Sequence, residues 1–125
     1  VTPELSLIGY PPEDLVLKPA LHAACMVQLE RMAAETAGGG PALLVGTTWA
    51  TDRGLHNGYA LLSEGWVAGV TLKHDLPNYG VFDEKRVFVA GPMPEPIEFR
   101  GVRLGLPICE DMWTPGVCGH LKDRG

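Results

Sequence analysis

The chain has 125 residues, of which 46% are hydrophobic and 20% are charged, as in an ordinary folded domain. Its net charge of -5 argues against a nucleic-acid partner, because such proteins concentrate Lys and Arg on one face. No apolar run approaches the roughly 20 residues that cross a bilayer, and no secretion signal opens the chain, so we expect a cytoplasmic protein without a membrane partner.

The cysteine and histidine pattern excludes the common structural sites. Cys25, Cys109 and Cys118 are an odd number without CxxC spacing, which predicts free thiols rather than a disulfide framework or a zinc site. The four histidines show no metal-ligand spacing either, so we expect no metal. The chain begins without Met and stops within a helical pattern, so we expect a fragment truncated at both ends.

Two helical segments are expected in the first third of the chain. The turn at 11–14 carries carboxylates that suit a first helical turn, and this turn should run through Leu17. Pro19 can then open a longer helix, which 38–41 (GGGP) would end. The apolar stripe of this helix recurs at the 3.6-residue period, at Leu21, Cys25, Gln28/Leu29 and Met32.

Beyond residue 41 the pattern changes to that of strands. The connection at 63–65 has hairpin length and contains Gly, so its flanking strands should be antiparallel. We expect strands over 42–46, 58–62, 66–72, 98–100 and 102–106. Residues 74–96 lack periodicity, and loops of that length are usually functional. An apolar strand at 107–109 should then run into a polar turn and a helix.

Three residues stand where chemistry is expected. Cys109, between strand and helix, would have its thiolate favoured by backbone N–H groups, which suits a nucleophile, although a buried small hydrophobic side chain is the simpler interpretation. Lys73 directly follows a long apolar strand, yet many such lysines only extend to water. Glu4 follows a proline and could equally be a solvated turn residue.

Their surroundings form a recognisable combination. Glu4 lies in PELSLIGYPPEDL, Lys73 in KHDLPNYGVFDEKR and Cys109 in LPICEDMW. These blocks resemble those of the nitrilase, or carbon-nitrogen hydrolase, superfamily, in particular the glutaminase domains of glutamine-dependent NAD synthetases. The resemblance runs from Thr2 to about Leu121, with little motif content between 35 and 66.

The resemblance implies a fold and a reaction. The fold would be α/β, part of a four-layer α-β-β-α sandwich, with residues 1–125 an internal piece of one glutaminase domain. Cys109 would attack the amide of glutamine, Glu4 would act as general base and acid, and Lys73 would stabilise the oxyanion. The ammonia released would serve an ATP-dependent ligase that amidates nicotinic acid adenine dinucleotide to NAD.

The same resemblance implies partners that lie outside these residues. The synthetase domain would follow in the same chain and would bind ATP and Mg²⁺, because no phosphate-binding loop occurs here. Family members assemble into homo-oligomers, so we expect one. The isolated 125-residue piece is expected to be inactive, since missing strands would leave an open core.

Four further residues match substrate-site positions of the family. Glu84 resembles a buried carboxylate that supports the lysine, with a solvated loop acid as the alternative. Tyr79 resembles an aromatic residue that packs on glutamine, or it merely covers the core. Glu110 and Trp113 match pocket walls, although Trp113 could equally be a core aromatic. His74 beside Lys73 is interpreted as a loop residue.

Two other functions remain open at this point. The first is a stand-alone amidase or carbamoylase with the same three residues and a different amide substrate. The second is a catalytically silent module that serves only as an assembly surface. A downstream SGGxDS loop in the gene would favour the synthetase over both.

Overall fold

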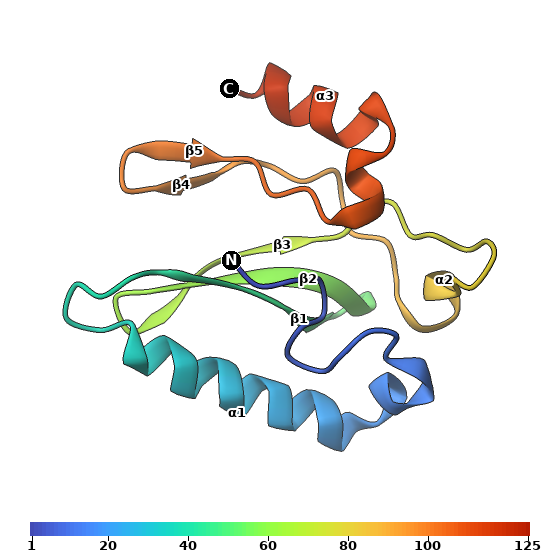
Figure 1. Cartoon of the computed structure of the whole chain (residues 1–125), viewed down its shortest axis with the longest axis horizontal. Helices are drawn as coiled ribbons and strands as arrows, with labels where there is room; N and C mark the ends of the chain where they lie inside the picture. Colours follow the sequence, from blue (N-terminus) through green and yellow to red (C-terminus); the bar gives the residue numbers. More distant parts are fainter.

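The computed structural model describes all of residues 1–125. The elements in chain order are the short 3₁₀ helix η1 (Glu13–Leu17), helix α1 (Pro19–Glu35), strands β1 (Leu43–Thr51), β2 (Gly54–Ser63) and β3 (Trp66–Leu72), helix α2 (Glu84–Val87), strands β4 (Ile97–Phe99) and β5 (Val102–Leu104), the 3₁₀ helix η2 (Cys109–Met112) and helix α3 (Pro115–Asp123). Helix α1 covers one face of the sheet, and the β4–β5 hairpin and α3 lie beyond the other (Figure 1). None of these helices is long and apolar enough to cross a membrane.

Strands β1, β2 and β3 form an antiparallel sheet in that order. The predicted hairpin across 63–65 is confirmed, and β3 spans the predicted residues. Strands β1 and β2 extend beyond the predicted ranges, because the polar stretch 47–57 continues both strands around a tight turn. Several polar residues of this stretch are buried, among them Thr47, Thr48 and Asn57, so the apolar pattern predicted strands that are too short.

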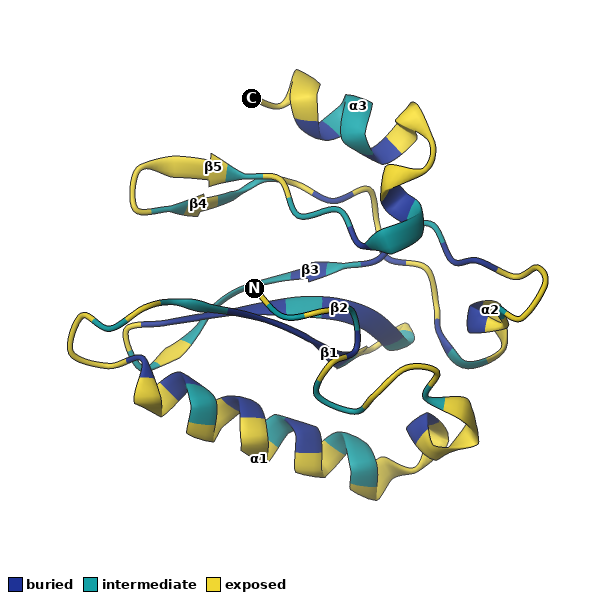
Figure 2. Ribbon diagram, in the orientation of Figure 1, coloured by how far each residue is buried: buried dark blue, intermediate teal, exposed yellow.

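Helix α1 packs on the sheet through one apolar stripe. Leu29 and Ala33 join Val45, Ala60 and Leu62 in the main hydrophobic cluster, and the buried side of the helix faces the strands (Figure 2). Burying one such aliphatic side chain contributes about 1.5–3 kcal/mol, so this interface anchors the sheet. The predicted stripe is confirmed at its centre by Cys25 and Leu29, whereas Leu21 and Met32 are half-buried and Gln28 is exposed.

The sheet face opposite α1 carries polar groups. Side chains alternate between the two faces of a strand, so Asn57, three residues from Ala60, points away from α1. The N-terminal segment lies against the edge strand β1 at Gly46. Its backbone is held there by hydrogen bonds from Thr2 N–H to the Leu44 carbonyl (2.9 Å) and from Leu7 N–H to the Gly46 carbonyl (3.0 Å). Residues 2–7 are therefore fixed along β1, which brings Glu4 close to Asn57.

The second strand pair is confirmed, but the expected strand before Cys109 is wrong. Strands β4 and β5 pair antiparallel, and Ile97 of β4 packs closely against Gly69 of β3. Ile108 has an extended backbone, yet its N–H donates to the Asp111 carboxylate (3.0 Å) instead of to a neighbouring strand. The segment before Cys109 is thus held by a side chain rather than by a sheet.

Candidate active site

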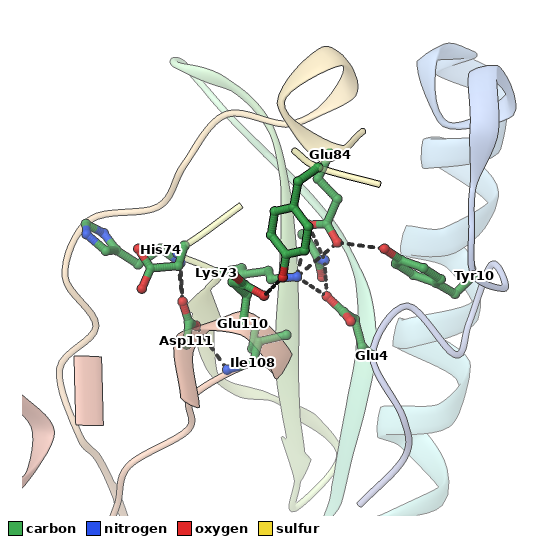
Figure 3. Close-up of polar contacts among 11 residues, drawn as sticks. Glu4, Tyr10, Lys73, His74, Glu84, Ile108, Glu110 and Asp111 are labelled. Carbon is green, nitrogen blue, oxygen red and sulfur yellow. Dashed lines mark hydrogen bonds and ion pairs between the residues drawn. The ribbon is translucent and has the colours of Figure 1, made fainter. Parts of the chain in front are cut away.

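Lys73 lies at the centre of a buried charged cluster. Its side chain is fully buried at the end of β3, where its Nζ is 2.5 Å from Oε1 of Glu4 and 2.9 and 3.0 Å from the two carboxylate oxygens of Glu84. Figure 3 shows the ammonium group between the two carboxylates. An ammonium has three protons; one points toward Glu4 and one is shared between the two closely spaced oxygens of Glu84, so the third is engaged by neither carboxylate. The predicted pairing of Lys73 with Glu4 and Glu84 is therefore present.

Two residues that the sequence analysis did not single out complete this cluster. The Tyr10 hydroxyl donates to Oε1 of Glu84 (3.1 Å), and Nδ2 of Asn57 donates to Oε1 of Glu4 (2.7 Å) and to Oε2 of Glu84 (3.3 Å). Burial, and then the charge and hydrogen bond of Glu84, raise the pKa of Tyr10. Tyr10 therefore stays a neutral donor at neutral pH. Tyr10 could have been selected from the sequence because it lies in the GYPPEDL block, whereas no local sequence feature indicated a role for Asn57.

The charge of Lys73 depends on its two partners. Burial alone would lower its pKa, but the hydrogen bonds and charges of Glu4 and Glu84 outweigh burial, and the pKa is raised from its ordinary value. Lys73 therefore remains an ammonium through the neutral range. Because Lys73 is one positive charge between two carboxylates, the cluster has a net negative charge when Glu4 and Glu84 are both ionised.

Cys109 begins η2 and adopts a left-handed backbone conformation, with φ of 48°. Such a φ is uncommon outside glycine and recurs where a nucleophile is presented on a sharp turn. Burial and the nearby charge of Glu4 raise the pKa of the thiol above its ordinary value, although Lys73 lowers it. This direction runs against the expectation of a favoured thiolate, because burial and then the Glu4 carboxylate outweigh Lys73. A base is needed to take the thiol proton.

Asp111 connects the segment before Cys109 to the segment after Lys73. Its Oδ1 accepts the N–H groups of His74 (3.1 Å) and Asp75 (2.7 Å), and its Oδ2 accepts the N–H of Ile108 (3.0 Å), as Figure 3 shows in part. Burial raises the pKa of Asp111, although these three N–H groups lower it. One buried carboxylate thus fixes the spacing between the chain segments that carry the amine and the thiol.

Glycine at position 46 allows Glu4 to approach the sheet. A Cβ atom on Gly46 would collide with the carbonyl oxygen of Pro3 and would lie 2.6 Å from the Leu5 nitrogen and 3.0 Å from the Glu4 carbonyl carbon. Replacing Gly46 with alanine should therefore displace Glu4 and cost about 1–3 kcal/mol, as overpacking does. Hydrogen exchange of the β1 amides in the intact protein measures this loss.

The same variant has a chemical readout and a matched control. Because the charge of Glu4 raises the pKa of Cys109, moving Glu4 away in Gly46→Ala should let iodoacetamide alkylate Cys109 at lower pH. Gly119 lies within α3 with nothing within 4 Å of an added Cβ, so Gly119→Ala should leave both readouts unchanged or slightly stabilise α3. Equal behaviour of the two variants would contradict the proposed close approach.

Of the four predicted substrate-site residues, Glu84 is the one that is hydrogen-bonded to Lys73. The Tyr79 hydroxyl donates to Oε2 of Glu110 (2.9 Å), and Phe82 meets the Tyr79 ring edge-on with centroids 5.7 Å apart. Tyr79 and Glu110 also border a pocket of about 660 Å³ that Glu4, Lys73 and Cys109 do not line. The Trp113 side chain is 63% exposed, and its backbone N–H donates to the Glu110 carbonyl (2.9 Å), so its role in a pocket wall stays a prediction.

The other candidate side chains lie apart from this chemistry. Nδ1 of His74 is 2.9 Å from the Gly91 carbonyl, which agrees with its interpretation as a loop residue. All three cysteines are free; Cys25 is a buried residue of α1, and Cys118 lies on α3. No group of three or more His, Cys, Asp or Glu side chains is arranged to hold a metal ion.

Comparison with known proteins identifies the family. The family model of the carbon-nitrogen hydrolases matches residues 1–125. The chain belongs to the carbon-nitrogen hydrolase family. It is 42% identical over 123 residues to the glutamine-dependent NAD(+) synthetase of Rhodobacter capsulatus, an alignment that covers 98% of this chain and 22% of the relative.

Solved structures of other carbon-nitrogen hydrolases share the fold. A glutamine-dependent NAD+ synthetase from Acinetobacter baumannii, solved with ADP, matches with a TM-score of 0.85 and 40% identity over 97% of this chain and 23% of that one. A carbon-nitrogen hydrolase from Helicobacter pylori matches with a TM-score of 0.74 at 24% identity, covering 98% of this chain and 43% of that one. The predicted nitrilase-like fold, in part, is confirmed. The chain spans about a fifth of the length of the curated relatives that it matches.

Proposed function

We propose that this chain is the glutamine-hydrolysing part of a glutamine-dependent NAD synthetase. The observation that carries the proposal is the Glu4–Lys73–Glu84 cluster beside the strained Cys109 turn. The relatives at about 40% identity that carry the synthetase name support the choice of glutamine among amide substrates.

In the proposed reaction, the Cys109 sulfur attacks the side-chain amide carbon of glutamine. The C–S bond forms as the thiol proton passes to the Glu4 carboxylate, which is required because the thiol pKa is raised. Glu4 then returns this proton to the amide nitrogen, the C–N bond breaks, and ammonia leaves. Water activated by Glu4 hydrolyses the thioester to glutamate and the free thiol.

Lys73 would stabilise the oxyanion that forms during attack. Glu4 and Glu84 engage two of its three protons, so the third can donate to the substrate oxygen while the charge of the ammonium stabilises the oxyanion. The charge is worth most in this water-excluded position. Glu110 and Tyr79 are proposed to bind the amino-acid end of glutamine, where a carboxylate suits the α-ammonium group.

The remainder of the proposal concerns groups outside residues 1–125. A synthetase domain in the same chain would use the ammonia to amidate nicotinic acid adenine dinucleotide, and it would bind ATP and Mg²⁺, because these residues contain no phosphate-binding loop. The proposal includes a cytoplasmic homo-oligomer and an isolated 125-residue chain without activity.

Affinity labelling of the intact protein tests the proposed nucleophile and substrate together. Diazo-oxo-norleucine, an electrophile that mimics glutamine, should form a single adduct on Cys109, and excess glutamine should prevent it. Peptide mass spectrometry locates the adduct, with Cys25 and Cys118 as internal controls. Labelling of Cys109 that glutamine fails to prevent would favour another amide substrate, and no labelling of a folded protein would favour a silent module.

A further inference from the structure

Asn57 touches three of the groups to which the proposed function assigns roles. It is fully buried in β2, the central strand of the sheet, on the face away from α1. Its carbonyl accepts the backbone N–H of Lys73 (2.9 Å), and its side-chain amide lies against both Glu4 and Glu84. No other position on the strand shares this set of contacts, because its neighbours point to the opposite face.

The chemistry of these partners fixes the orientation of the amide. The –NH₂ group of Asn57 has two protons and faces two carboxylates, Glu4 at 2.7 Å and Glu84 at 3.3 Å. A flipped amide would place its oxygen against two anions. In the observed orientation Oδ1 of Asn57 is buried and has no partner. The side chain thus leaves one polar atom unsatisfied while it donates to both carboxylates, as expected where function rather than stability selects a residue.

The contact with Glu4 distinguishes its two oxygens. Lys73 (2.5 Å) and Asn57 (2.7 Å) both donate to Oε1, and neither donates to Oε2. We propose that Asn57 is a positioning residue for glutamine hydrolysis: together with Lys73 it holds Oε1, so that Oε2 is the oxygen that exchanges a proton with Cys109. This inference rests on the proposed function. Without Asn57, the carboxylate can rotate about the single contact with Lys73, and the aligned base is lost.

The experiment compares two replacements of Asn57 in the intact protein. Asn57→Ala removes the amide, and Asn57→Leu keeps the branched shape of the side chain without charge and without an –NH₂ donor. Both should lower kcat for glutamine hydrolysis by about 100-fold, as a misplaced catalytic group does, with KM changed less than about threefold. If Asn57 only filled space, the leucine variant would be the more active of the two. A kcat within about fivefold of the wild type in either variant would overturn the proposal.

Controls separate this inference from folding and from the proposed function. Ser63→Ala removes a buried polar side chain at the other end of β2 and should leave kcat unchanged. Hydrogen exchange of β2 amides monitors the fold of each variant. If Asn57→Ala does not fold, Asn57→Ser, which has a single hydroxyl donor, should give an intermediate kcat. Full activity of Asn57→Ser would overturn the proposal. A wild type that releases no ammonia from glutamine refutes the proposed function itself, whereas an active wild type with equally active Asn57 variants refutes only the positioning role.

Discussion

Replacing Glu4 with glutamine should abolish glutamine hydrolysis and yet make Cys109 more reactive. Loss of a general base costs about 100- to 10,000-fold in rate. The charge of Glu4 also raises the pKa of the Cys109 thiol, so its removal leaves Lys73 opposed by the smaller effect of Glu84 and increases the thiolate fraction. Iodoacetamide should therefore alkylate Cys109 faster at pH 7.5 in Glu4→Gln, by about threefold for each unit of pKa lost, since nucleophilicity falls with pKa.

The two readouts of Glu4→Gln move in opposite directions, which separates the base from a structural role. A variant that lost hydrolysis only because the site became disordered would not show alkylation of Cys109 shifted to lower pH. Glu30→Gln makes the same chemical change on the exposed side of α1 and should alter neither readout. Slower alkylation in Glu4→Gln would contradict the assignment of Glu4 as the group that holds the thiol protonated.

The fold was predictable wherever one kind of periodicity dominates. The stripe on α1, the hairpin between β2 and β3 and the pair β4–β5 follow from apolar spacing and a glycine in the turn. The prediction was wrong where tertiary contacts replace local ones. Ile108 is held by the Asp111 carboxylate rather than by a strand, and no local pattern could reveal that contact.

The site was predictable from motifs but not from geometry. Glu4, Lys73 and Glu84 were selected because their sequence blocks resemble a family, and the structure brings them within hydrogen-bonding distance. Asn57 escaped selection because it lies in the middle of a strand, where a polar residue ordinarily argues against burial. The raised pKa of Cys109 also depends on a residue more than 100 positions away in the chain, which spacing cannot encode.

Replacing Lys73 with methionine should destabilise the sheet as well as stop the reaction. Lys73 is fully buried between Glu4 and Glu84, and removing one partner of a buried ion pair costs about 3–5 kcal/mol, because the carboxylates are left uncompensated. The raised pKa of Lys73 has a definite sign. The ionised Lys73 contributes its full stabilisation below the ordinary pKa of 10.5, and this contribution disappears as pH rises through the raised pKa of the folded protein. The loss of stability in Lys73→Met should therefore be at its maximum at pH 7.

A double variant tests whether uncompensated charge causes this loss. Adding Glu84→Gln to Lys73→Met removes one of the two carboxylates and should recover part of the stability, while hydrolysis stays absent because the ammonium is still missing. Hydrogen exchange of β2 and β3 amides in the intact protein measures the effect, with protection expected to fall about 100-fold or more in Lys73→Met. Lys122→Met, on the exposed side of α3, is the matched control. If the double variant were no more stable than Lys73→Met, lost packing rather than unpaired charge would explain the change, and the electrostatic role of Lys73 would be refuted.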